Sequence, residues 1–225
     1  MKIVAVIPAR YKSSRFLGKP VADINGKPMI WWVYNRVLKV NKIDDVIVAT
    51  DSDIIYDICN KYHLKVMMTS EDHATSTERV YEVAKNVKSD IYVVINGDEP
   101  LVDPDAIEKV IPNGEHYKPN TYHISNIVTK IRNPAEVLDS SNIKIVHDKD
   151  YNCIYMSRNP IPYPHHSLDV VYKKHVGILA YNYRALKFFY NKKPLTLEKA
   201  EGINELRFIE YGIKVTQLSE FDKWR

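Results

Sequence analysis

Apolar residues in the first hundred positions follow two alternating periodicities. Short runs rich in β-branched residues predict buried strands over residues 2–7, 45–50, 65–69 and 90–96. Between these runs, apolar side chains recur at helical spacing and predict helices over residues 29–38, 53–62 and 77–87. The apolar stripe of the first helix comprises Ile30, Val33, Tyr34, Val37 and Leu38. Strands that alternate with helices indicate an α/β fold with a doubly wound parallel sheet and right-handed crossovers.

The pattern changes beyond Pro104. Further strands are predicted over residues 122–131, 142–146 and 153–156, with polar turns and no helices between them, which indicates a small antiparallel extension. Three prolines within residues 160–164 stiffen an exposed arm, either a dimer-forming arm or a plain surface loop, and residues 177–181 return as a strand. We expect a single domain over residues 1–225, with a core at 1–104 and the extension and dimerisation arm at 120–182.

A basic loop follows the first predicted strand. Residues 10–19 carry four cations, and the loop contains small and hydroxyl-bearing residues as well. Because ligands of α/β proteins bind at the carboxyl edge of the parallel sheet, this loop is suited to a triphosphate. A solvated basic loop is the alternative interpretation. The loop residues that we expect to contact phosphate are Pro8, Ala9, Arg10, Ser13, Ser14, Arg15 and Lys19.

Two adjacent carboxylates follow the strand predicted at residues 90–96. Gly97 permits close approach of the backbone, and Asp98 and Glu99 come next, at the same sheet edge as the basic loop. Mg²⁺ binds one or two carboxylates together with substrate phosphate, so Asp98 is the predicted metal ligand. In the alternative interpretation, Asp98 and Glu99 cap a helix that has Pro100 in its first turn. This capping role is a stronger alternative to metal binding for Glu99 than for Asp98.

A polar segment enters the helix predicted at residues 77–87. His73, Ser76, Thr77 and Arg79 could hold a base, a ribose or a phosphate at the positive end of the helix dipole. The four residues 75–78 fit a helix-capping arrangement equally well.

Composition narrows the class of protein. The net charge of +4 includes no long basic tract, which favours anionic small molecules over nucleic acid as ligands. Cys59 and Cys153 lie in apolar stretches without zinc-ligand spacing, so we expect buried thiols. No run reaches the length of a membrane span and no signal peptide is recognisable, so we expect a cytoplasmic protein without membrane contact.

These motifs together resemble the 3-deoxy-manno-octulosonate cytidylyltransferases, or CMP-Kdo synthetases. The likeness extends over nearly the whole chain in order and spacing. It is carried by residues 7–15, 18–20, 23–30 and 48–51, His73 with 77–79, 97–100, 157–163, 175–178 and 206–207.

The resemblance implies a Rossmann-like fold of the nucleotidyltransferase type, with the CTP-binding core at residues 1–104. It implies transfer of CMP from CTP with Mg²⁺ and release of diphosphate, for bacterial surface polysaccharide synthesis by a homodimer. In-line displacement at the α-phosphorus would use Arg10, Arg15, Lys19 and Asp98 as catalytic residues. The nucleotide would contact the basic loop, His73, Ser76, Thr77, Arg79, Gly97 and Asp98. An anionic acceptor, a Kdo-like sugar acid, would contact Asn96, Arg158, His175, Asn204 and Glu205.

The chain departs from the family pattern mainly at the acceptor end. The family has Gln where Asn96 stands, Glu-Gln where Asn204-Glu205 stand, and a C-terminal segment with a second metal-binding Asp that has no counterpart before Arg225. Two alternatives therefore stay open: a CTP:phosphoglutamine cytidylyltransferase that makes a CDP-linked product for capsule modification, and a non-catalytic nucleotide-binding protein.

Overall fold

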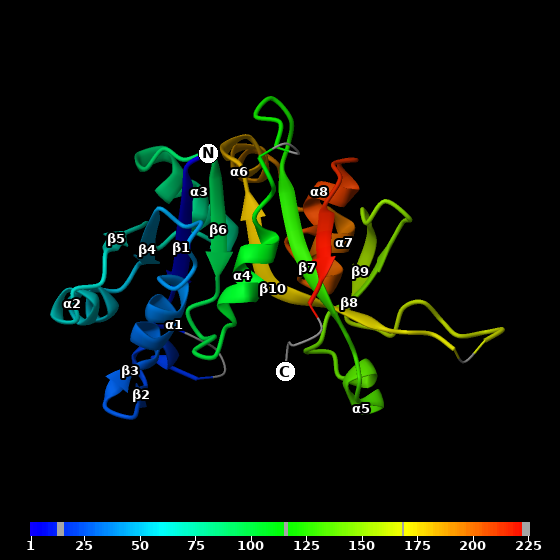
Figure 1. The fold of residues 1–225 in the computed structure, drawn as a ribbon, viewed down its shortest axis with the longest axis horizontal. Helices are drawn as coiled ribbons and strands as arrows, with labels where there is room; N and C mark the ends of the chain where they lie inside the picture. Colours follow the sequence, from blue (N-terminus) through cyan, green and yellow to red (C-terminus); the bar gives the residue numbers. More distant parts are fainter. Residues whose placement is uncertain (13–15, 115–116, 168, 222–225) are drawn as a thin grey trace.

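One mixed sheet organises the molecule (Figure 1). A computed structural model describes residues 1–12, 16–114, 117–167 and 169–221, apart from the side chains of 217–219. Within these residues, seven strands follow one another across the sheet in the order β11-β7-β10-β6-β1-β4-β5, and β8 and β9 extend it beside β10. The strands of this sheet are β1 (Ile3–Ala9), β4 (Asp45–Thr50), β5 (Val66–Met68), β6 (Ile91–Ile95), β7 (Ile124–Lys130), β8 (Lys144–His147), β9 (Cys153–Ser157), β10 (Lys173–Tyr181) and β11 (Thr216–Glu220).

The strands pair mostly in parallel, as predicted. β1 lies between β4 and β6 and pairs in parallel with both, and β5 continues this half beyond β4. β10 runs antiparallel between β6 and β7, and β11 is parallel to β7. The segment 120–182 thus differs from the predicted extension, because β7 and β10 are strands of the main sheet. Its antiparallel hairpin consists of β8 and β9, and the helix α5 (Pro134–Leu138) lies where the sequence predicted only a turn.

Helices cover both faces of the sheet. Alternate residues of β1 enter two separate cores: Ile3, Ala5 and Ile7 pack on one side, and Val4 and Val6 on the other. The first core is closed by α1 (Met29–Val37), α2 (Asp53–Lys61) and α4 (Pro104–Val110). The second is closed by α3 (Ser76–Asn86), α6 (Tyr183–Asn191) and α8 (Leu206–Glu210), with α7 (Thr196–Glu201) beside α8. A period of two along buried strands therefore builds the predicted doubly wound arrangement.

The shorter elements lie between the first strand and the first helix. A 3₁₀ turn, η1 (Lys19–Val21), precedes the small hairpin β2 (Asp23–Ile24) and β3 (Lys27–Pro28), which leads into α1. α1 ends at Val37, one residue before the predicted end, so Leu38 is 57% exposed and not part of the buried stripe. Cys59 and Cys153 are buried free thiols, as predicted.

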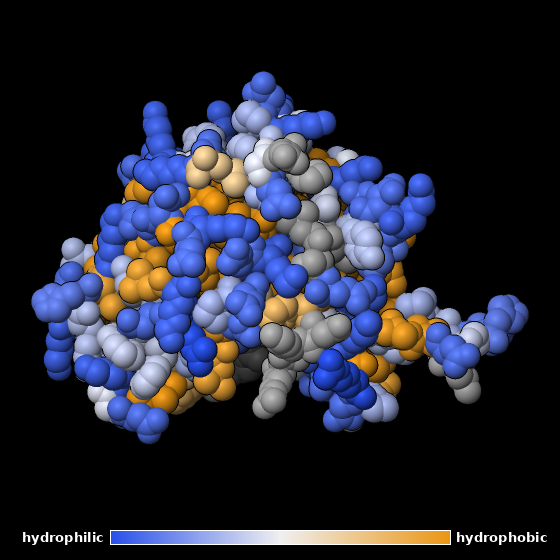
Figure 2. Space-filling view, in the orientation of Figure 1, coloured by the Kyte–Doolittle hydropathy of each residue, from blue (hydrophilic) through white to orange (hydrophobic). Residues whose placement is uncertain are grey.

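An arm projects from the body between β9 and β10 (Figure 1). Its exposed residues include Tyr163 and Val171, and Figure 2 shows apolar side chains near its root and polar ones at its tip. No helix in the described ranges is both long enough and apolar enough to cross a bilayer.

Candidate active site

A cleft of about 220 Å³ opens at the carboxyl edge of the parallel strands. Its walls come from the end of β1, the η1 turn, the segment before α3 and the end of β6. Eight residues predicted to bind nucleotide or acceptor line it: Pro8, Ala9, Arg10, Lys19, Ser76, Asn96, Gly97 and Asp98. The remaining lining residues are Pro20 and Ala74. The predicted residues Ser13, Ser14 and Arg15 lie outside the described residues.

Lys19 and Asp98 form an ion pair within the cleft. Lys19 Nζ lies 2.7 Å from Asp98 Oδ2, and the two side chains keep 36% and 38% of their exposure. Asp98 caps no helix, because α4 begins only at Pro104 and takes its cap from Asp103. The carboxylate is therefore available to a ligand of the cleft.

Gly97 brings the ends of β1 and β6 together. A Cβ at this position would lie 3.1 Å from the carbonyl oxygen of Pro8, so the close approach leaves little room for a side chain. Glu99 follows in a more enclosed position, where burial and the neighbouring Asp98 carboxylate raise its pKa. Of the two adjacent acids, Asp98 lines the cleft and Glu99 does not.

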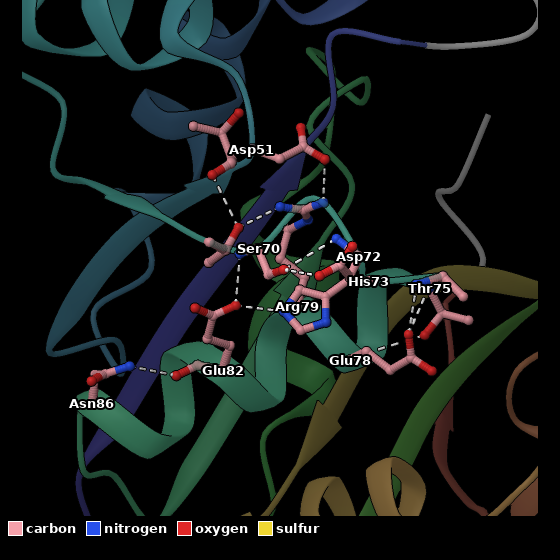
Figure 3. Close-up of polar contacts among 12 residues, drawn as sticks. Asp51, Ser70, Asp72, His73, Thr75, Glu78, Arg79, Glu82 and Asn86 are labelled. Atoms are coloured by element: carbon pink, nitrogen blue, oxygen red, sulfur yellow. Dashed lines mark hydrogen bonds and ion pairs between the residues drawn. The ribbon is translucent and has the colours of Figure 1, made fainter.

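Arg10 closes the cleft toward α3. Its Nη2 donates to the carbonyl oxygen of His73 over 2.7 Å. The His73 ring points the other way, with Nε2 2.5 Å from Glu82 Oε2 (Figure 3). In this conformation His73 orients Arg10 through its backbone, and its ring is not part of the cleft lining.

Arg79 is fully buried beneath the α3 terminus. Its Nη2 lies 2.5 Å from Asp51 Oδ2 at the end of β4, and its Nη1 donates to the Thr69 hydroxyl (Figure 3). Burial lowers the Arg79 pKa, and the Asp51 carboxylate opposes that shift. The guanidinium therefore fixes α3 against β4 and does not line the cleft.

The residues before α3 form a capping box. The Thr75 hydroxyl accepts from the Glu78 N–H, and the Glu78 carboxylate accepts from the Thr75 N–H (Figure 3). The capping alternative is correct for these two residues. Ser76 remains in the cleft wall, and Thr77 is buried behind it.

Polar side chains continue from the cleft to the opposite half of the molecule. Asn204 Nδ2 donates to the Thr77 hydroxyl over 3.3 Å, and the Tyr181 hydroxyl donates to Glu205 Oε1 over 2.9 Å. Asn96 lies so close to Gly177 of β10 that a Cβ there would be 2.8 Å from its Nδ2. Of the predicted acceptor residues, Asn96 thus lines the cleft and lies against β10, whose Tyr181 bonds to Glu205, and Asn204 bonds to Thr77 behind the cleft wall.

His175 belongs to the same strand as Gly177 and Tyr181. Its Nδ1 lies 2.6 Å from Asn126 Nδ2, which also donates to the Val176 carbonyl. Burial lowers the pKa of His175, against an opposing effect of the Glu205 carboxylate. The ring is therefore neutral near neutral pH, and with Nδ1 as the acceptor its proton is on Nε2.

Arg158 lies at the root of the projecting arm. Its Nε donates to the Glu201 carbonyl and its Nη1 to the Ser140 carbonyl. Within the described residues, no contact joins Arg158 to the cleft, so its acceptor role stays a prediction.

Sequence reasoning did not select Tyr181, Asn126 or Asp51 as site residues. Each contacts a predicted residue that lies far away in the sequence. Asp51 belongs to the segment 48–51 that carries the family resemblance, but no pattern in the sequence indicated its contact with Arg79. A second hollow of about 630 Å³ lies beside α4, but none of the predicted site residues lines it. The described residues contain no cluster of three or more metal-binding side chains.

The fold and the cleft define an α/β protein of the nucleotidyltransferase type, with cations and a carboxylate at the ligand-binding edge of its sheet. A family model for cytidylyltransferases matches residues 4–215. The chain is 40% identical to an 8-amino-3,8-dideoxy-manno-octulosonate cytidylyltransferase of Shewanella frigidimarina, over 99% of this chain and 92% of that relative. It is 36% identical to a 3-deoxy-manno-octulosonate cytidylyltransferase of Christiangramia forsetii, over 95% and 87% of the two chains.

Comparison with solved structures also finds a relative in complex with CTP. A CMP:2-keto-3-deoxy-manno-octonic acid synthetase complexed with CTP superposes with a TM-score of 0.91 at 37% identity, covering 98% of this chain and 91% of that one. The chain belongs to the cytidylyltransferase family, and it is a CTP-dependent nucleotidyltransferase.

Proposed function

We propose that the enzyme transfers CMP from CTP to an eight-carbon 3-deoxy sugar acid for surface polysaccharide synthesis. An acceptor hydroxyl oxygen bonds to the α-phosphorus of CTP while the bond from that phosphorus to the α,β-bridging oxygen breaks. The hydroxyl proton passes to solvent, and diphosphate leaves. The observation that carries the proposal is the Lys19–Asp98 pair in a cleft that Asn96 also lines.

The residues of the cleft act by position and charge. Arg10 and Lys19 neutralise the phosphates, and Gly97 allows the nucleotide to approach the strand ends. Arg15, which lies outside the described residues, is a further proposed phosphate contact. Asn96 and the Nε2–H of His175 would position the acceptor.

The proposed cofactor is Mg²⁺, held by Asp98. One carboxylate fits this ion, because Mg²⁺ commonly keeps several waters and takes its other ligands from substrate phosphate. The bound ion would supply charge neutralisation at the α-phosphate. Since Lys19 already contacts Asp98 Oδ2, it must share this carboxylate with the ion or move onto the phosphates.

We propose further that the enzyme is a cytoplasmic homodimer, in which the arm between β9 and β10 contacts the second subunit. The support is the exposed apolar character of Tyr163 and Val171 on that arm, which are 80% and 62% exposed. Light scattering after gel filtration measures the mass, and a monomer at micromolar concentration would contradict the dimer.

The test of the proposed function is CTP-dependent release of diphosphate. The acceptors are 3-deoxy-manno-octulosonate, its 8-amino-3,8-dideoxy analogue and phosphoglutamine, each with and without Mg²⁺. Release with either sugar acid is expected. Release with phosphoglutamine alone would favour the capsule-modifying alternative, and CTP binding without release would favour the non-catalytic one.

Asp98→Asn checks the metal assignment. We expect kcat to fall about 100- to 1000-fold, the size of comparable electrostatic contributions. Stability should change little, because exposed ion pairs contribute about 0 to 1 kcal/mol. The exposed pair Lys42–Glu108 supplies the control variant Glu108→Gln. Full release of diphosphate by the Asp98→Asn protein would overturn the assignment.

A further inference from the structure

Glu205 is a buried acid that forms no ion pair with any described residue. The residue is 5% exposed and stands immediately before α8. Tyr181 donates to its Oε1, while Oε2 has no hydrogen bond and no ion pair to any residue of the described ranges. The other buried acid nearby, Glu198, is neutralised by a two-pronged contact with Arg207. Glu205 differs because nothing in the described part of the chain balances its charge.

Glu205 lies behind the cleft and is linked to its lining residues through two neighbours. Its neighbour Asn204 bonds to Thr77, which follows Ser76 of the cleft wall. Its partner Tyr181 lies on β10, the strand that also carries His175 and contacts Asn96 through Gly177. A single group of polar side chains therefore leads from the cleft to the Glu205 carboxylate.

A carboxylate in this place requires a specific reason. The acceptor is itself an anion, so a second negative charge beside it is unfavourable unless the acceptor also carries a positive group. His175 does not supply that charge, because burial lowers its pKa and keeps the ring neutral. A buried charge is costly unless it is paired, and a charge-assisted hydrogen bond is the arrangement that offsets the cost best.

We propose that Glu205 recognises an ammonium group on the acceptor, so that the enzyme selects an amino sugar acid over the analogue with a hydroxyl in the same place. The proposal rests on the proposed function and names its substrate class. Overall sequence identity to the relatives does not decide between the amino acceptor and the hydroxyl acceptor. The relatives named for the amino acceptor and for the hydroxyl acceptor are 40% and 36% identical to this chain.

The experiment compares kcat/KM for two acceptors, 8-amino-3,8-dideoxy-manno-octulosonate and 3-deoxy-manno-octulosonate. The native enzyme should prefer the amino acceptor by about 10- to 100-fold, the contribution of one charged hydrogen bond. In Glu205→Gln the preference should disappear, through loss of kcat/KM for the amino acceptor, while the Kd for CTP stays unchanged.

Two further variants separate recognition from folding. Glu210→Gln removes the carboxylate at the end of α8, whose hydrogen bonds within the described residues come from the backbone N–H groups of Leu197 and Glu198, and it should keep the native preference. Tyr181→Phe removes the hydrogen-bond donor to Glu205 but leaves the Glu205 charge, so the preference for the amino acceptor should persist.

Activity with neither sugar acid would contradict the proposed function itself. Equal use of both acceptors by the native enzyme, or an unchanged preference in Glu205→Gln, would overturn the role of Glu205 alone.

Discussion

At the scale of single residues, the contact between Gly177 and Asn96 couples a strand of the second half to the cleft. Gly177 lies in the irregular part of β10, between the two stretches that pair with β7. A methyl group there would stand 2.8 Å from Asn96 Nδ2, closer than non-bonded atoms approach. The backbone itself tolerates alanine, since Gly177 is not among the glycines with a left-handed conformation. The effect of Gly177→Ala therefore falls on the Asn96 side chain.

We predict that Gly177→Ala raises the KM for the acceptor about tenfold, the cost of one misplaced hydrogen bond of about 1.4 kcal/mol. Because Asn96 and not the phosphate-binding residues must move, the Kd for CTP should be unchanged. Steady-state kinetics and calorimetric titration with CTP measure the two quantities. Gly114→Ala is the matched control, because nothing lies within 4 Å of its added Cβ. An unaltered acceptor KM would show that Asn96 does not position the acceptor.

The sequence predicted the cleft residues better than it predicted their orientation. Arg10 comes directly after β1, Lys19 lies in the loop that follows it, and Asp98 comes shortly after β6, so the topology of a parallel sheet brings them to one edge. The directions of His73 and Arg79 depend instead on Glu82 and Asp51, and no local pattern specifies such partners. Pairing of this kind becomes visible only when the chain is folded.

At the scale of elements, α3 is fixed to the sheet by the buried pair of Arg79 and Asp51. The Arg79 side chain is fully buried and that of Asp51 is 18% exposed, so the pair is shielded from solvent. Arg79 Nε has no partner within the described ranges, which makes the guanidinium dependent on the contacts of its two other nitrogens. The cleft wall at Ser76 begins this helix and depends on the same attachment.

We predict that Asp51→Asn lowers the free energy of unfolding by about 3 to 5 kcal/mol, the usual cost of leaving a buried charge unpaired. Urea denaturation measures this loss. Adding Arg79→Met should recover part of it, because the second change removes the orphaned charge. Glu108→Gln, which breaks the exposed pair with Lys42, should cost less than about 1 kcal/mol. A similar small loss in Asp51→Asn would show that the buried pair contributes little.

Hydrophobic periodicity predicted the strands and helices of the first half of the chain, but it did not predict how the strands of the second half pair. β1, β4, β5 and β6 are short apolar runs that pair in parallel with their neighbours, and the helices between them carry clear apolar stripes. β7 and β10 pair across about fifty residues of sequence, as with Asn126 and Leu179, so their register is set by the tertiary structure. The short helices α7 and α8 are each stabilised by packing and by the Glu198–Arg207 contact more than by local propensity.

At the scale of the whole molecule, Glu201 joins the projecting arm to the body. It accepts from the Ser157 hydroxyl at 2.6 Å, from the Arg158 N–H at 2.9 Å and from the Tyr155 hydroxyl at 3.2 Å. Burial raises the pKa of Glu201, but these hydrogen bonds and the Arg158 charge outweigh burial, so the pKa lies below its ordinary value of 4.5. The carboxylate form is therefore the one that holds the arm in place.

A lowered pKa in the folded state gives stability that is complete above the unfolded value of 4.5 and is lost as the pH falls through the folded value. We predict that Glu201→Gln lowers the free energy of unfolding by about 1 to 2 kcal/mol at neutral pH, after allowance for solvent screening. The difference from the native protein should shrink as the pH falls below 4.5 and should vanish once Glu201 is protonated. Thermal unfolding over a pH series measures both curves, with Asp150→Asn as a control at an exposed carboxylate. A gap that persisted in acid would mean that the amide disturbs packing at the root of the arm and that the charge of Glu201 does not hold the arm.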